Sequence, residues 1–117
     1  MQQQMSDWEL PPDASIPGLA CFRELLVPRI LAFESFRQII EQGPGANAAL
    51  RDMAALSHKI AGVAAALGYP GTGDHAAAVE TTIRHGLAAG ENTAEIWRTT
   101  MPLLESLLDD MERILDD

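Results

Sequence analysis

Apolar residues recur at the spacing of an α-helix in four successive segments of this chain, and clusters of Gly and Pro separate the segments. No segment alternates apolar and polar residues between hairpin turns, as a half-buried β-strand would. The pattern therefore predicts an all-α fold, an antiparallel up-down four-helix bundle with an additional short N-terminal helix or arm. At 117 residues the chain can bury one modest core but not two.

Capping and breaking residues set the expected boundaries of these segments. Residues 1–15 are polar and lack a helical period, so we expect a flexible N-terminal arm followed by one bundle domain over residues 16–117. The expected elements are a short helix from Ser15 or Pro17 to about Leu26, a helix that ends at Gln42, a helix over 46–67, a helix after an Asp74 N-cap, and a helix after a Thr93 cap.

Proline and glycine carry three further expectations. Pro28 is expected in the first turn of its helix, where the missing N–H costs nothing. The run Tyr69–Gly73 is expected to be a loop, because Gly and Pro are turn residues. Pro102 lies inside the apolar stripe of the last helix, which predicts a kink or a break near Met101.

The charge balance limits the partners of the chain. Its 17 acidic and eight basic residues give a net charge of −9, which repels nucleic acid phosphates and anionic membrane surfaces. Neither a transmembrane run nor a signal-peptide pattern occurs, so a cytoplasmic protein without nucleic acid or membrane partners is expected. Cys21 is the single cysteine, has no disulfide partner in the sequence, and is expected to be a semi-buried apolar residue.

His58 lies in an unusual position on the helix predicted over 46–67. At about 100° per residue, Leu50, Met53, Ile60 and Val63 share one apolar arc that should face the core, and His58 lies about 160° from Ile60. The only lysine, Lys59, follows it directly, and Arg51 lies two turns earlier. Its small neighbours form a predicted collar of Ala54, Ala55, Ala61, Gly62, Ala65 and Ala66. Minimal side chains leave the imidazole accessible, so we interpret His58 as a nucleophile on a protein-docking surface.

Other chemistries lack the residues that they need. The sequence contains no G-x-S-x-G elbow and no G-x-x-x-x-G-K-[ST] phosphate loop. His75 and His85 do not share a helix face and the Glu-x-x-His pairs of di-iron bundles are missing, so no metal or other cofactor is predicted. These two histidines are interpreted as first-turn and last-turn helix residues without a functional role. The acidic C-terminus around Asp109-Asp110 is interpreted as a solvated face.

The segment over 56–68, LSHKIAGVAAALG, resembles the signature of the histidine-containing phosphotransfer (HPt) domain family. The matching residues after the histidine are Ile60, Gly62, Leu67 and Gly68. The pair Val79-Glu80 is similar to an aliphatic–Glu pair in the next helix of that family. The resemblance implies that Nε2 of His58 accepts a phosphoryl group from the aspartyl phosphate of a receiver domain and passes it to another receiver.

The resemblance also implies the partners and the surrounding site. The partners would be response-regulator receiver domains or a hybrid histidine kinase, and the chain would act as a monomer without autonomous catalytic activity. The residues that would bind the phosphoryl group or the partner are Lys59, Gly62, Ala61, Ala55, Ala65 and Arg51. Many family members carry a lysine three residues after the histidine, where this chain has Ala61.

Two alternatives are compatible with the sequence. The dimerisation helices of histidine kinases also expose a phospho-accepting histidine, although an acidic residue typically follows it and Lys59 is basic. A degenerate HPt-like bundle would instead act as an adaptor that binds a receiver or a kinase without accepting phosphate, which Ala61 permits. Phosphorylation of His58 distinguishes the phosphotransfer protein from the adaptor.

Overall fold

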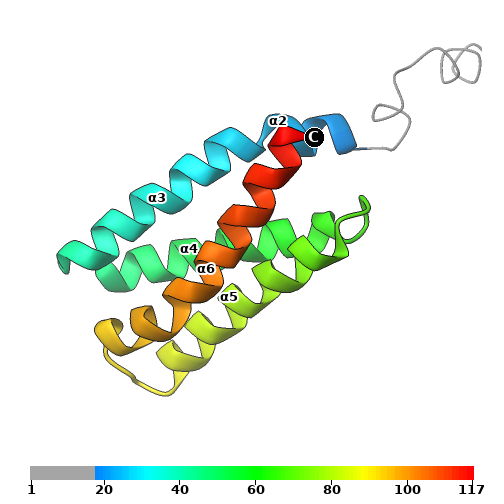
Figure 1. The fold of residues 1–117 in the computed structure, drawn as a ribbon. Coiled ribbons are helices and arrows are strands. Elements are labelled where there is room, and N and C mark those ends of the chain that lie inside the picture. Colours follow the sequence, from blue (N-terminus) through cyan, green and yellow to red (C-terminus); the bar gives the residue numbers. More distant parts are fainter. Residues whose placement is uncertain (1–17) are drawn as a thin grey trace, which may run out of the picture.

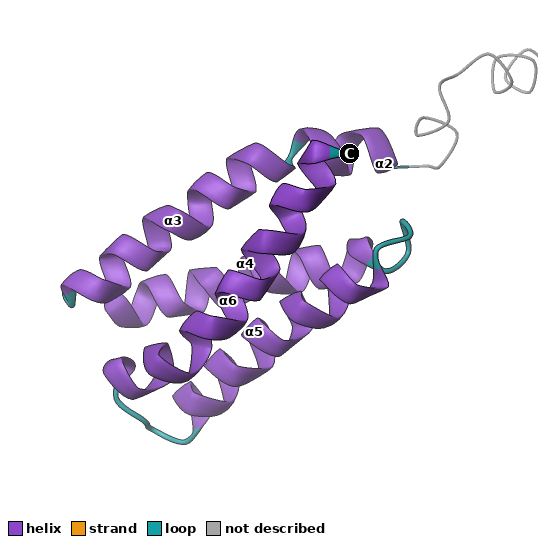
Figure 2. Cartoon of the chain, in the orientation of Figure 1, coloured by secondary structure: helices purple, strands orange, loops and turns teal. Residues whose placement is uncertain are grey.

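Residues 18–117 are described by the structure, a computed structural model, and they fold into helices joined by short turns (Figure 1). The helices are α2 (Leu19–Glu24), α3 (Leu26–Gln42), α4 (Ala46–Ala64), α5 (Pro70–Ala88) and α6 (Thr93–Asp116). No strand occurs over these residues (Figure 2). The predicted all-α fold is confirmed for this range, whereas the arm expected at residues 1–15 lies outside the described residues.

The helices pack so that α4 lies against both α3 and α5, while α6 packs against α5 and α3 (Figure 1). The short helix α2 contacts α3. Buried apolar side chains from all five helices form one continuous core. Its largest fully buried members are Phe33, Leu26, Leu50, Met53, Ile60, Ile83, Ile96, Leu104, Leu107 and Met111. This core fixes the rotation of each helix about its own axis, and therefore decides which side chains reach the surface.

The helix α3 ends where its sequence predicts, but it begins at Leu26, which was expected to end the preceding short helix; that helix, α2, ends at Glu24. Pro28 lies in the first turn, where backbone N–H groups have no partner within the helix. Gly43 ends the helix with a φ of 103°, a conformation that glycine adopts without the steric cost of a side chain. The predicted end at Gln42 is confirmed.

The junction between α4 and α5 differs from the prediction. The helix α4 ends at Ala64 rather than at residue 67, and α5 begins at Pro70 rather than after an Asp74 cap. Proline suits the first helical position, because its fixed φ is helical and its missing N–H would be unpaired there. Gly73 is helical, and a Cβ on it would lie 3.4 Å from the Cβ of Ala65, the residue that follows α4. The expected loop is wrong for residues 70–73, because the glycine serves close helix packing instead of a turn.

The helix α6 is more continuous than predicted. Asn92 rather than Thr93 caps it, with Oδ1 accepting a hydrogen bond from the N–H of Glu95 at 2.8 Å. The helix continues through Pro102, so the break expected near Met101 does not occur. An internal proline costs about 3 kcal/mol, and burial of the apolar face of α6 offsets this cost. That face consists of Ile96, Leu104, Leu107, Leu108, Met111 and Ile114.

We expect Gly86→Ala to destabilise the fold, because a Cβ at this position of α5 would lie 2.6 Å from Cγ1 of Ile96. Overpacking of a well-packed core typically costs about 1–3 kcal/mol. Gly71→Ala in the first turn of α5 is the matched control, since a Cβ there meets nothing within 4 Å. Chemical denaturation measures both variants. A Gly86→Ala variant as stable as Gly71→Ala would contradict the close contact between α5 and α6.

Candidate functional site

His58 lies on the outer face of α4, as its helical position predicts. Its side chain is 72% exposed, whereas Leu50, Met53 and Ile60 are fully buried. Burial of these apolar side chains sets the rotation of α4, and this rotation directs His58 away from the core.

The imidazole of His58 is held from one side by α5. Its Nδ1 atom lies 3.0 Å from Oε1 of Glu80, and Oε2 of the same carboxylate accepts a hydrogen bond from Nε of Arg84 at 2.8 Å. Glu80 and Arg84 are one helical turn apart on α5, so their side chains meet. The Glu80 carboxylate, which is only 18% exposed, thus connects a histidine on α4 with a guanidinium on α5.

The antiparallel alignment of α4 and α5 brings these side chains together. Glu80 lies opposite His58. Gly73, seven residues earlier on α5, lies against Ala65, which is seven residues after His58 and caps the end of α4. The absence of a side chain at Gly73 lets the two helices approach closely. Because the gap between the helices is narrow, the side chain of Glu80 reaches the imidazole directly.

The contact with Glu80 determines which ring nitrogen of His58 is free to react. An ionised carboxylate only accepts hydrogen bonds, so Nδ1 of His58 carries the hydrogen that it donates to Glu80. In the neutral ring, Nε2 then bears the lone pair. The ring therefore has a fixed orientation and an unprotonated second nitrogen, which are the properties of a nitrogen nucleophile.

The pKa of Glu80 is lowered from its ordinary value of 4.5. Burial raises the pKa and is the largest single influence, but the hydrogen bonds and charges of Arg84 and His58 together outweigh it. The carboxylate is consequently ionised at neutral pH, and a neutral imidazole beside it carries its hydrogen on Nδ1.

We expect Glu80→Gln to change the pH dependence of stability. Because folding lowers the pKa of Glu80, the stabilisation from its ionised form is fully present above the ordinary value of 4.5. It is lost as the pH falls through the lower folded-state pKa. The difference in unfolding free energy between wild type and Glu80→Gln should therefore shrink in acid. Denaturation at neutral pH and below the folded-state pKa measures this difference, and a constant difference would contradict the assignment.

Small side chains surround His58, as predicted at five positions. Ala61 is half-buried, and the exposed residues are Ala55, Gly62, Ala65 and Ala66, the last two just beyond the end of α4. A Cβ on Gly62 would meet nothing within 4 Å, so the space above this residue is open. A flat partner surface can therefore approach His58 across these small residues.

Some α4 residues lie on a different face from the one predicted. Ala54, expected in the collar, is fully buried, and Val63, expected in the core, is 38% exposed. Ala54 is buried because α4 packs against two helices, α3 and α5, so its buried arc is wider than a one-sided stripe. Ser57 is buried for the same reason, and its hydroxyl has no hydrogen-bond partner among the described residues.

The two cations predicted near the site, Lys59 and Arg51, differ in how close they lie to the imidazole of His58. Lys59 is exposed beside His58. Arg51 is also exposed, but its Nε donates to Oδ1 of Asn47 at 3.0 Å, one further turn away from His58. Neither cation contacts the Glu80 carboxylate that holds the ring.

Sequence reasoning missed the role of Glu80 and did not select Arg84. The pair Val79-Glu80 was the available signal, because it matches the pattern of the similar family. Glu80 is separated from His58 by 22 positions in the chain. The contact is therefore visible only once the alignment of α4 with α5 is known.

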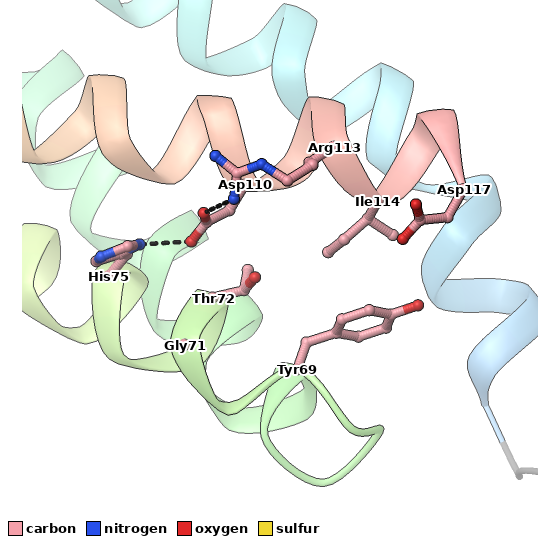
Figure 3. Close-up of a pocket in the computed structure, with 8 residues that line it drawn as sticks. All are labelled: Tyr69, Gly71, Thr72, His75, Asp110, Arg113, Ile114 and Asp117. Carbon is pink, nitrogen blue, oxygen red and sulfur yellow. Dashed lines mark hydrogen bonds and ion pairs between the residues drawn. The ribbon is translucent and has the colours of Figure 1, made fainter.

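His75 has a similar set of partners at the contact between α5 and α6. Its Nδ1 contacts Oδ2 of Asp110, whose Oδ1 accepts a hydrogen bond from Arg113 at 2.9 Å (Figure 3). These residues line a cavity of about 290 Å³. The interpretation of His75 as an isolated first-turn residue is wrong, because α5 begins one turn earlier. Asp110 is buried rather than part of a solvated acidic face.

Of the two remaining residues with a predicted place, one lies as expected and the other does not. His85 lies in the last turn of α5, as predicted. Cys21 is exposed rather than semi-buried, because Leu19 and Phe22 are the residues of α2 that face the core. Over residues 18–117, His, Cys, Asp and Glu side chains do not gather in a group of three or more that could hold a metal ion.

Comparisons of the chain with protein families, curated proteins and solved structures find no match. Within the part of the chain that the structure describes, none of the helices has both the length and the apolar character needed to cross a membrane. The chemistry that the chain can support therefore follows from its own residues.

Proposed function

We propose that this protein is a histidine phosphotransfer protein of a multistep phosphorelay. In this function His58 accepts a phosphoryl group from the aspartyl phosphate of one receiver domain and passes it to another receiver. The observation that carries the proposal is the state of the imidazole: Nδ1 is engaged by Glu80 at 3.0 Å, while Nε2 is free on a side chain that is 72% exposed. The resemblance of residues 56–68 to the HPt signature supports the same function.

The packing of the helices supports this class of protein. In the proposal, α3, α4, α5 and α6 form the antiparallel up-down four-helix bundle, and α2 is the additional short helix that precedes it. The contacts of α6 with both α5 and α3 are those of a closed four-helix arrangement. The protein acts as a cytoplasmic monomer, since a receiver needs the surface around His58 to be uncovered.

The transfer step uses the free lone pair of His58. Nε2 attacks the phosphorus atom, an N–P bond forms, the P–O bond to the receiver aspartate breaks, and the aspartate leaves as a carboxylate. The hydrogen on Nδ1 stays on the ring, so the phosphorylated imidazole carries a positive charge beside the Glu80 carboxylate. Phosphoryl transfer depends mainly on in-line positioning and charge neutralisation. The receiver supplies the aspartate and Mg²⁺, and this chain supplies the nucleophile and a docking surface.

Incubation with phosphorylated receiver domains tests the proposal. The expected result is an acid-labile, alkali-stable label on His58, which then moves to a second, unphosphorylated receiver. The adaptor is the alternative function, and the absence of a lysine at Ala61 is the observation that favours it. A receiver that binds the protein without labelling it would support the adaptor and contradict phosphotransfer.

A further inference from the structure

Arg84 is bound through one nitrogen and keeps its other donors free. Its Nε donates to Oε2 of Glu80 at 2.8 Å, and its two terminal amino groups have no hydrogen-bond partner among the described residues. The side chain is 52% exposed. It lies on the same carboxylate that holds His58. An arginine in this arrangement can present two parallel N–H donors to an incoming anion.

Two other ion-paired arginines of the described residues, Arg98 and Arg113, use their donors differently. Arg98 binds Glu95 through a terminal amino group at 2.7 Å, and Arg113 binds Asp110 through a terminal amino group at 2.9 Å. Pairing through Nε, as in Arg84, leaves the double-donor end of the guanidinium unused.

The proposed function creates a need for a cation at this place. A phosphoryl group brings up to about two negative charges to a chain whose net charge is already −9. Ala61 occupies the position of the lysine found in the similar family and carries no charge. Lys59 lies about 100° around the helix from His58, and Arg51 lies about 10 Å away along the helix axis.

We propose that Arg84 binds the phosphoryl group on His58 and neutralises its charge. This inference rests on the proposed phosphotransfer function. It places on α5 the cation that many members of the similar family carry as a lysine three residues after the histidine, where this chain has Ala61. The terminal amino groups of Arg84 donate to two phosphoryl oxygens while Nε remains on Glu80. Arg84 thus acts when the N–P bond forms at Nε2 and the P–O bond to the receiver aspartate breaks, and it afterwards stabilises the phosphohistidine.

The lifetime of phosphohistidine tests this role without a partner protein. Phosphoramidate phosphorylates histidine directly, so the whole chain can be labelled and the loss of label from His58 followed with time. Arg84→Gln is expected to shorten the lifetime about tenfold, because a charge-assisted pair of hydrogen bonds is lost. Arg98→Gln removes an exposed, paired arginine on α6 and is expected to leave the lifetime unchanged. Thermal unfolding confirms that both variants fold.

A double variant separates the charge of Arg84 from its support of Glu80. Ala61 is half-buried one turn after His58, and a lysine there can extend its ammonium group along the surface. Adding Ala61→Lys to Arg84→Gln should restore the lifetime, because the new cation lies beside the phosphoryl group. Nitrogen-15 NMR of the His58 ring should show hydrogen on Nδ1 in each variant.

The outcomes distinguish the inference from the function on which it rests. A lifetime that does not change in Arg84→Gln, or a loss that Ala61→Lys does not restore, overturns the role of Arg84. If phosphorylated receivers transfer no phosphoryl group to the wild-type protein, the phosphotransfer function is overturned. The phosphohistidine lifetimes measured after labelling with phosphoramidate still test the role of Arg84 in that case. A His58 that phosphoramidate leaves unlabelled overturns both.

Discussion

Replacing His58 with Gln is expected to abolish phosphoryl acceptance and to leave the helices folded. The glutamine side chain has no ring nitrogen with a free lone pair, so no N–P bond can form. The side chain of His58 is 72% exposed and makes one interhelical hydrogen bond, to Glu80. Loss of such an exposed contact costs about 1 kcal/mol or less. The measurements are labelling by a phosphorylated receiver and the melting temperature.

The other histidines provide the matched controls for this variant. His85→Gln in the last turn of α5 should label like wild type. His75→Gln should also label, although its contact with Asp110 makes some loss of stability expected. Residual labelling of His58→Gln that disappears when His75 is also replaced would contradict the assignment of His58 as the acceptor. A large fall in melting temperature would contradict its placement on the outer face.

Gly62→Gln is expected to block transfer while the free energy of unfolding stays the same or rises. The residue lies one turn after His58 on the exposed face of α4, and a Cβ on it meets nothing within 4 Å. The new side chain would therefore project into the space that a receiver has to occupy. Glycine in a helix interior is disfavoured by about 0.5–1 kcal/mol relative to alanine. Loss of transfer together with unchanged or increased stability is the result to look for.

Ala48→Gln is the control for Gly62→Gln. It adds the same side chain to an exposed position of α4 that lies nearer the start of the helix. Transfer rates and denaturation curves should be compared for the two variants and wild type. Unimpaired transfer by Gly62→Gln would show that the small residues around His58 have no role in docking.

The local signals in the sequence were sufficient where the chain itself decides the conformation. Pro28 and Gly43 act through their own backbone geometry, so the place of Pro28 in the first turn of α3 and the end of α3 could be predicted. The exposure of His58 could also be predicted, because burial of Leu50, Met53 and Ile60 fixes the rotation of α4.

The same local signals gave wrong predictions where packing against a neighbouring helix decides the conformation or the burial of a residue. Gly73 is indistinguishable from a turn glycine in the sequence, and only the approach of α4 shows that it allows close packing within α5. The kink or break expected near Met101 rested on the local cost of Pro102, and the break does not occur because burial of the α6 face offsets this cost. Ala54 was misplaced because a one-sided apolar stripe does not describe a helix held between two others.

The sequence by itself therefore determined the all-helical fold of the described residues and the candidate nucleophile, because helical periodicity is a property of each segment alone. Only the tertiary structure decided which groups surround that nucleophile. Glu80 contacts His58 from another helix and binds Arg84 beside it, through an alignment set by close packing of α4 on α5. A contact of this kind depends on the distance between two helices, and no spacing within either helix encodes that distance.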